Sequence, residues 1–162
     1  MKLQTRSIAG FSLIELVVTV AIIGILASIA VPFAELSVRR AKEQELRIAL
    51  RQIRTAIDDY KKAADEGRIA RLADSSGYPP SLAVLEQGVE NAQDPESKAL
   101  IYFIRRIPRD PFHTDSAATA ADTWGKRSYE SPPSEPRPGK DVFDVFSLSA
   151  ESGINGVPYR QW

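Results

Sequence analysis

The chain has 162 residues, with 21 basic and 21 acidic side chains and no cysteine. This length allows one globular domain of modest size and an extended element. The balanced charge argues against a polyanion-binding surface, so we expect no nucleic-acid binding. The lack of cysteine excludes disulfides, thiolate metal ligands and cysteine nucleophiles.

An apolar run over residues 11–31 contains a single charged side chain, Glu15. A helix of about 20 residues covers roughly the 30 Å hydrocarbon core of a bilayer, so the run predicts a membrane span. Lys2 and Arg6 precede it, which favours a cytoplasmic N-terminus, although three basic residues between positions 39 and 42 follow it. We therefore predict a single-pass membrane protein.

Two small residues, Ala9 and Gly10, lie before this run, whereas the cleavage site of an ordinary secretory signal follows its apolar region. Cleavage here would leave the membrane helix attached. Glu15 lies one turn into the span, where a charge costs about 2.5–3.5 kcal/mol. A cut after Gly10 would give Phe11 a free α-amino group, a cation that can pair with Glu15 of the same or a neighbouring subunit. The alternative is an uncleaved signal anchor whose Glu15 extends toward the membrane surface.

The segment around this carboxylate also resembles a known family. Gly10-Phe-Ser-Leu-Ile-Glu-Leu, an apolar helix and then Pro32 are similar to the processing and assembly segment of type IV prepilins and type II secretion pseudopilins. The resemblance implies a leader peptide over residues 1–10, which a prepilin peptidase removes between Gly10 and Phe11. It further implies N-methylation of the Phe11 amine and a role for Glu15 in subunit assembly.

Gly24 and Pro32 interrupt the helical pattern of the span, because glycine weakens a helix and proline removes an amide donor. We predict a helix break or kink at each. In the resembled family this stretch can lose helicity on polymerisation, which implies an extension joint between the two residues. The alternative is that both are tolerated, as such residues often are in membrane helices.

Beyond Pro32, apolar residues recur every three or four positions as far as Ala64, which predicts an amphipathic helix over residues 33–66. Gly67 is its expected terminator. The other face carries i,i+4 charge pairs and is predicted to be solvated. These pairs are Glu35/Arg39, Glu43/Arg47 and Asp58/Lys62. Residues 11–32 and 33–66 are thus expected to be the membrane half and the head-domain half of one interrupted helix.

The head domain is predicted to comprise residues 67–162. Ser81 can cap a short helix, and residues 97–106 are predicted to form a short helix or turn. Residues 125–129 and 141–148 are the strand candidates, joined by a proline-rich loop in an antiparallel pair. The fold class is therefore α+β, with a long N-terminal helix packed on a small antiparallel sheet, as in pilins.

The order of the head motifs resembles the major, G-type pseudopilins of type II secretion systems. The motifs are Tyr78-Pro-Pro-Ser-Leu, Ile107-Pro-Arg-Asp-Pro-Phe, Trp124-Gly-Lys-Arg-Ser-Tyr and Asp144-Val-Phe-Ser-Leu-Ser. The resemblance implies a helical homo-oligomer that promotes protein export, in the bacterial inner membrane with its head in the periplasm. It implies a prepilin peptidase, minor pseudopilins, and an assembly platform with a cytoplasmic ATPase as partners. The alternatives are a type IV pilin for adhesion, motility or DNA uptake, and a monomeric membrane-tethered binding domain.

Major pseudopilins of this kind bind calcium in a C-terminal loop, which implies a possible site in residues 147–162. This stretch lacks the family's aspartates, and an ion that takes six to eight oxygens finds few charged ones here. The candidate ligands are Ser149, Glu151 and Asn155. The alternative is that Tyr159 and Trp162 pack the tail onto the head, with Gly153 and Gly156 in its turns.

Enzyme chemistry has little support in the sequence. The one histidine, His113, lies in a predicted loop with no nucleophile pattern nearby. The sequence has no glycine-rich phosphate loop, serine elbow or His/Cys metal spacing. We therefore predict a structural protein without enzymatic activity.

Overall fold

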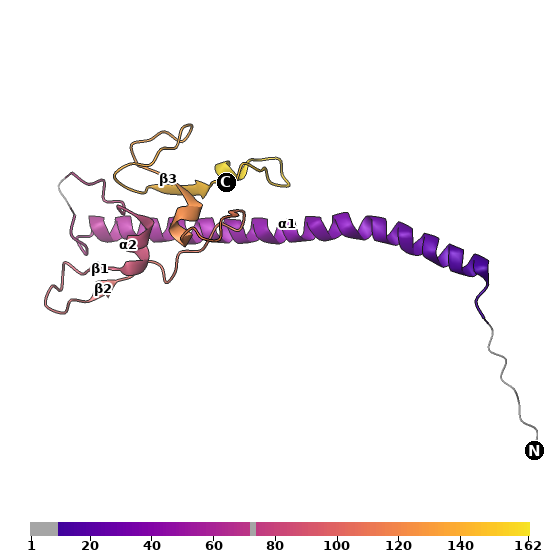
Figure 1. The fold of residues 1–162 in the computed structure, drawn as a ribbon. Coiled ribbons are helices and arrows are strands. Elements are labelled where there is room, and N and C mark those ends of the chain that lie inside the picture. Colours follow the sequence, from indigo (N-terminus) through magenta and orange to yellow (C-terminus); the bar gives the residue numbers. More distant parts are fainter. Residues whose placement is uncertain (1–9, 72–73) are drawn as a thin grey trace, which may run out of the picture. The chain divides into compact units, whose positions relative to one another are not determined.

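The computed structural model describes residues 10–71 and 74–162, without the side chains of residues 29–31. The chain divides into two units, Met1–Arg40 and Ala41–Trp162, and helix α1, Leu13–Asp65, belongs to both (Figure 1). The predicted leader lies outside the described residues except for Gly10.

In the first unit, α1 exposes a long series of apolar side chains. By length and composition this stretch is able to cross a membrane. Its exposed large side chains include Leu13, Ile14, Leu16, Val17, Val18, Val20, Ile22, Ile23, Ile25 and Leu26. Nothing else in the described chain covers them, which is the arrangement expected of a helix that faces lipid or other helices.

Helix α1 is continuous through Gly24 and Pro32, so the structure shows no interruption of the helix at either residue, and a kink there stays a prediction. Proline removes one hydrogen bond from the helical ladder, but the turns on either side keep theirs and helix propagation is cooperative. A Cβ built on Gly24 meets no atom within 4 Å, so this glycine serves no close contact within the chain.

In the second unit, α1 presents one apolar stripe to the core. The buried side chains recur at intervals of three and four residues, as predicted for an amphipathic helix. They are Leu46, Ala49, Leu50, Ile53, Ala56, Ile57, Tyr60, Ala63 and Ala64. Gly67 ends the helix as predicted, with a φ of 69°. The amide of Gly67 donates to Ala64, and that of Arg68 donates to Ala63, the pattern of a Schellman cap.

Two antiparallel strand pairs, instead of the single small sheet expected, complete the second unit. After α2, Leu82–Gln87, strands β1, Val89–Glu90, and β2, Leu100–Ile101, pair with each other. Strands β3, Trp124–Arg127, and β4, Asp144–Ser147, form the second pair. Two short 3-10 helices, Ala120–Thr123 and Tyr159–Gln161, follow the loops. The α+β class is therefore confirmed.

Most predicted head elements lie where the sequence indicated. Helix α2 begins directly after Ser81, which occupies the N-cap position without a side-chain capping hydrogen bond. Strands β3 and β4 overlap the two predicted strands. The prediction of a short helix or turn over residues 97–106 was wrong for Leu100–Ile101, which form β2. Their pairing with β1 is a non-local interaction, and such tertiary contacts override weak local propensity.

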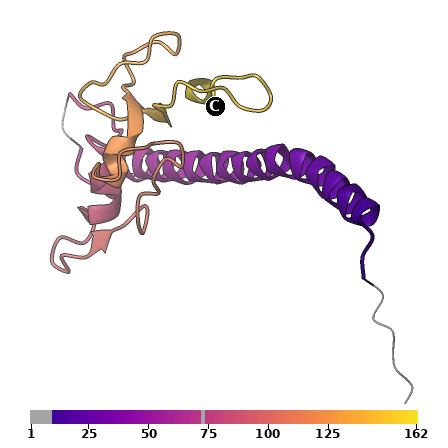
Figure 2. The same ribbon diagram turned by 45° about the vertical axis from the view of Figure 1, so that its right-hand side comes forward.

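The core of the second unit lies between the stripe of α1 and the remaining elements. Trp124 of β3 and Val145 of β4 are buried against it, together with Leu85 of α2. The Trp124 indole nitrogen donates to the carbonyl of Pro108 at 2.8 Å, so its polar group is satisfied. Strand β3 and the C-terminal segment lie on the same side of the head part of α1 in both ribbon views (Figures 1 and 2).

We predict that Ile53→Ala lowers the free energy of unfolding of the head by about 2–5 kcal/mol, because Ile53 is fully buried on α1. Chemical denaturation of the chain in detergent, followed by tryptophan fluorescence, measures this loss. Ile48→Ala is the matched control, since Ile48 lies on the same helix but is 40% exposed. Equal losses in the two variants would contradict the assigned core.

Candidate functional site

The predicted cleavage point lies in non-helical backbone. Gly10 and Phe11 precede the first residue of α1, Leu13. The Phe11 side chain is 81% exposed, and a Cβ built on Gly10 meets no atom within 4 Å. Among the described residues, nothing covers the peptide bond between these two, and it precedes the helix, as a peptidase substrate needs.

Glu15 occupies the first turn of α1, where a negative charge interacts favourably with the helix dipole. Its carbonyl accepts a hydrogen bond from the Thr19 hydroxyl at 2.9 Å, while its carboxylate is exposed. Within residues 10–71 and 74–162, this carboxylate makes no hydrogen bond or ion pair. A cation that pairs with Glu15 must therefore come from a group that these contacts do not include. The α-amine that cleavage would create on Phe11 is one such group.

A second group of residues, at the other end of the sequence, fixes the C-terminal loop. The loop turns at residues 153–157, where the Gly153 amide donates to Val157 and the Gly156 amide to Gly153, each at 2.8 Å. Gly156 has a φ of 77°, a value that favours glycine. A Cβ on Gly153 would come within 2.4 Å of the Trp162 ring. Both glycines therefore serve the turn, as predicted.

Glu43 of α1 is buried, although the charge pattern of the sequence predicted that it is solvated. The i,i+4 pattern placed it with Arg47 on a solvated face, but Glu43 is only 7% exposed. Its Oε1 accepts hydrogen bonds from the Ile154 amide at 2.7 Å and from the Tyr159 hydroxyl at 3.0 Å. The charge pattern could not indicate this burial, because the two donors lie more than 100 residues away along the chain.

Two arginines of α1 hold the last residue of the chain. The Arg47 guanidinium lies over the Trp162 ring, 4.4 Å from its centroid. Arg54 donates to the main-chain oxygen of Trp162 at 2.8 Å and to the Asp144 carboxylate of β4 at 2.8 Å. We call Glu43, Arg47, Arg54, Tyr159 and Trp162 the C-terminal latch.

The aromatic half of the latch confirms the predicted packing of the tail. The Tyr159 side chain is fully buried, and its ring stacks on Phe112 with centroids 4.1 Å apart. Trp162 contacts Tyr159 edge to face at 5.0 Å. These ring contacts, with the hydroxyl bonded to Glu43, tie the loop to both α1 and the segment before β3.

Two of the three candidate calcium ligands, Ser149 and Asn155, accept hydrogen bonds from within the loop. The Ser149 hydroxyl oxygen accepts the Glu151 amide at 3.3 Å, and Asn155 Oδ1 accepts the Val157 amide at 3.1 Å. The Glu151 carbonyl accepts the Tyr159 amide at 3.1 Å. In the part of the chain that the structure describes, no group of three or more His, Cys, Asp or Glu side chains could hold a metal ion. The available donor set does not fit calcium.

Asp110, in the motif around residue 107, is a further residue whose role sequence reasoning missed. It is buried, and its Oδ2 accepts the Ser147 hydroxyl of β4 at 2.5 Å, while its Oδ1 accepts the Phe112 amide at 2.8 Å. The main-chain oxygen of Asp110 accepts the His113 amide at 3.1 Å. His113 therefore lies in a structured turn, and within the described part of the chain no hydrogen bond joins its ring to a nucleophilic side chain.

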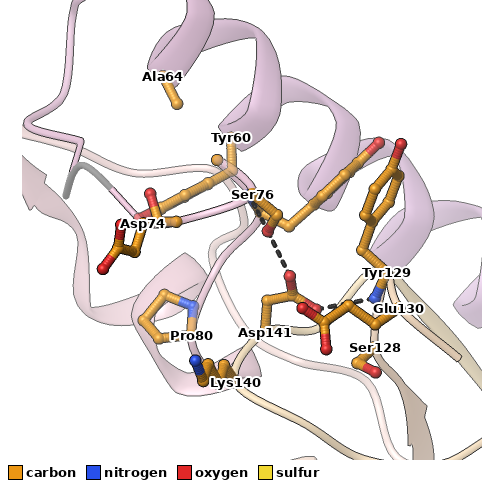
Figure 3. A pocket seen from close by; sticks show the side chains of 13 residues that line it. Tyr60, Ala64, Asp74, Ser76, Pro80, Ser128, Tyr129, Glu130, Lys140 and Asp141 are labelled. Atoms are coloured by element: carbon orange, nitrogen blue, oxygen red, sulfur yellow. Dashed lines mark hydrogen bonds between the residues drawn. The ribbon is translucent and has the colours of Figure 1, made fainter.

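A cleft of about 650 Å³ opens elsewhere on the head (Figure 3). Its walls include Tyr78, Tyr129 and Asp141. The Asp141 carboxylate accepts the Ser76 hydroxyl and the Tyr129 amide, so it holds two walls together. Burial is the main cause that raises the pKa of Tyr78. Asp141 thus organises the walls of the cleft.

The chain is similar to known proteins over most of its length. Residues 5–31 match the family model described as the prokaryotic N-terminal methylation motif. A type II secretion system core protein G from Klebsiella pneumoniae is 33% identical over 92% of this chain and 86% of its own length. The chain belongs to the type II secretion system core protein G family. The Vibrio cholerae core protein G is 29% identical over 94% of this chain and 88% of its own.

One relative bears another name. The type IV major pilin protein PilA of Myxococcus xanthus is 39% identical, but over only 52% of this chain and 42% of its own length. No solved structure matched the chain significantly. Core protein G relatives therefore cover nearly the whole chain, while the pilin similarity covers about half.

We predict that Arg54→Ala lowers the free energy of unfolding by about 1–3 kcal/mol, because Arg54 joins α1 to β4 and to Trp162. Partial exposure of the Arg54–Asp144 pair limits the loss. Arg51→Ala is the control, since Arg51 is exposed on the same helix. Thermal or chemical unfolding measures both; a loss for Arg51→Ala as large as that for Arg54→Ala would contradict the assigned role.

Proposed function

We propose that this chain is the major pseudopilin of a type II secretion machine, a structural subunit that polymerises through its N-terminal helix to promote protein export. The observation that carries the proposal is an exposed carboxylate, Glu15, in an exposed apolar helix directly after the non-helical Gly10–Phe11 bond. The similarity to core protein G over nearly the whole chain supports secretion as the purpose.

Processing prepares the subunit for assembly. A prepilin peptidase removes residues 1–10, and the new Phe11 amine becomes N-methylated, which keeps its positive charge. This amine then pairs with Glu15 of a neighbouring subunit. The attraction between two charges is stronger in an apolar environment than in water. The pair therefore stabilises the axial register of neighbouring helices that brings the two charges together.

The apolar face of α1 changes its surroundings on polymerisation. Before assembly its exposed side chains contact lipid, and afterwards they contact neighbouring helices. Lipid is as apolar as these side chains, so packing and polar contacts, and not hydrophobic burial, select the register. A heterologous contact repeated from subunit to subunit generates an open helical filament. The segment between Gly24 and Pro32, helical in the single chain, is the proposed extension joint of the filament.

The proposed location follows from the charges at the start of the chain. Lys2 and Arg6 favour a cytoplasmic N-terminus, which leaves the head in the periplasm of a cell whose inner membrane holds the span. The proposed partners are the prepilin peptidase, minor pseudopilins, and an inner-membrane assembly platform with its cytoplasmic ATPase. The role is structural, without enzymatic activity.

A type IV pilin for adhesion, motility or DNA uptake is the second candidate, favoured by the similarity to PilA. Deletion of the gene separates the two. Loss of exported proteins from the culture medium, with twitching and DNA uptake retained, is the result expected for a pseudopilin. Loss of twitching or DNA uptake alone would favour the pilin.

We predict that the chain purified from its own membrane begins at Phe11 and carries a methyl group on the α-amine. Intact-mass spectrometry followed by N-terminal fragmentation measures both features. Gly10→Val is expected to retain residues 1–10, because it replaces the small residue at the cleavage point with a bulky one. A wild-type chain that keeps its leader would contradict the proposal.

We predict that Glu15→Leu leaves membrane insertion intact but abolishes filaments, since removal of the charge makes the span more apolar while the neighbouring amine loses its partner. Membrane fractionation and electron microscopy of sheared filaments measure the two effects. Glu35→Leu is the control, an exposed acidic residue of α1 beyond the apolar run. Undiminished filament formation in Glu15→Leu would remove the proposed role, and is what a monomeric membrane-tethered domain predicts.

A further inference from the structure

We propose that Glu43 of α1 fixes the C-terminal loop in the place of a divalent cation, so that the head of this chain keeps its fold and its ordered loop without calcium. The proposal concerns the head alone. It holds whether the filament serves secretion or another process.

Glu43 contacts the loop at two points with one oxygen. The Ile154 amide, inside the turn at residues 153–157, and the Tyr159 hydroxyl, after it, both donate to Oε1. A buried carboxylate is costly unless donors satisfy it, and these two donors do so. The loop therefore gains a rigid connection to α1, and the carboxylate gains the positive dipoles that its burial requires.

The other polar members of the latch lie on the same face of α1. Glu43, Arg47 and Arg54 are separated by four and seven residues, which places them along one side of a helix. Arg47 covers the Trp162 ring, and Arg54 binds the main-chain oxygen of Trp162 and the Asp144 carboxylate. The tail is thus held beyond the turn as well as within it.

Few oxygen atoms of the loop are available as ligands for a cation. Glu151 is the one side-chain carboxylate in residues 147–162, whereas calcium takes six to eight oxygens. The Ser149 hydroxyl and the Asn155 side-chain oxygen accept amides of the loop itself. Glu43 Oε1 already accepts two hydrogen bonds, so this oxygen could bind a cation only by losing donors that fix the loop.

The test uses the full chain in detergent micelles, in calcium chloride or in EGTA, with magnesium chloride as an ionic control. The thermal midpoint and the amide exchange of residues 147–162 are expected to be the same in both media. A site filled at about 100 times its Kd would raise the midpoint by several degrees. Such a rise in calcium, or slower exchange of the loop in calcium than in EGTA, would overturn the proposal.

Three variants test the role of Glu43. Glu43→Ala is expected to speed exchange of the Ile154 amide by about tenfold or more, because the donor loses a charged acceptor. Glu43→Gln keeps an oxygen acceptor, so it should fold and show a smaller increase, which keeps the test valid if Glu43→Ala fails to fold. Glu45→Ala, an exposed neighbour on α1, should leave exchange unchanged.

Two results of the variant series would overturn the proposal. One is unchanged exchange of residues 147–162 in both Glu43 variants, since the loop would then be fixed by other contacts. The other is calcium stabilisation of the wild type that is lost in Glu43→Gln, which would make Glu43 a cation ligand.

Discussion

A carboxylate in an apolar membrane span is costly unless a cation meets it, and the N-terminal part of this chain is arranged around that cost. Glu15 is exposed in the first turn of α1, and no cation contacts it within the described residues. The bond whose cleavage would supply an amine, between Gly10 and Phe11, lies just ahead of the helix in uncovered backbone. In the proposed function, processing and assembly are linked, because a cut after Gly10 would create the positive charge that Glu15 requires.

The second half of the same helix stabilises the head through an apolar stripe and three charged side chains. An apolar stripe from Leu46 to Ala64 supplies most of the core on its side, while Glu43, Arg47 and Arg54 hold the last residues of the chain. Because α1 is helical on both sides of Pro32, the exposed apolar segment and the buried stripe of the head belong to one helix. The head of this member of the core protein G family is thus organised by groups from α1, and the loop oxygens serve the loop itself.

Local sequence patterns predicted much of the fold of the head. The three- and four-residue spacing identified the buried stripe, Gly67 marked the helix end, and the valine- and phenylalanine-rich run indicated β4. The errors came from contacts distant in sequence: β2 forms because β1 is beside it, and Glu43 is buried because the tail returns to α1. The helix stays continuous at Pro32 for another reason. The hydrogen bonds of the turns on both sides stabilise it by more than the one missing bond destabilises it.

The central claim is that Glu15 meets the Phe11 amine of another subunit. A cryo-electron microscopy reconstruction of filaments assembled from the processed chain tests it most directly, at a resolution that shows side chains in the helical core. The account predicts the Glu15 carboxylate within about 4 Å of the methylated Phe11 nitrogen of a neighbouring subunit, the range of a salt bridge. Filaments in which every Glu15 carboxylate lies far from any such amine would contradict it.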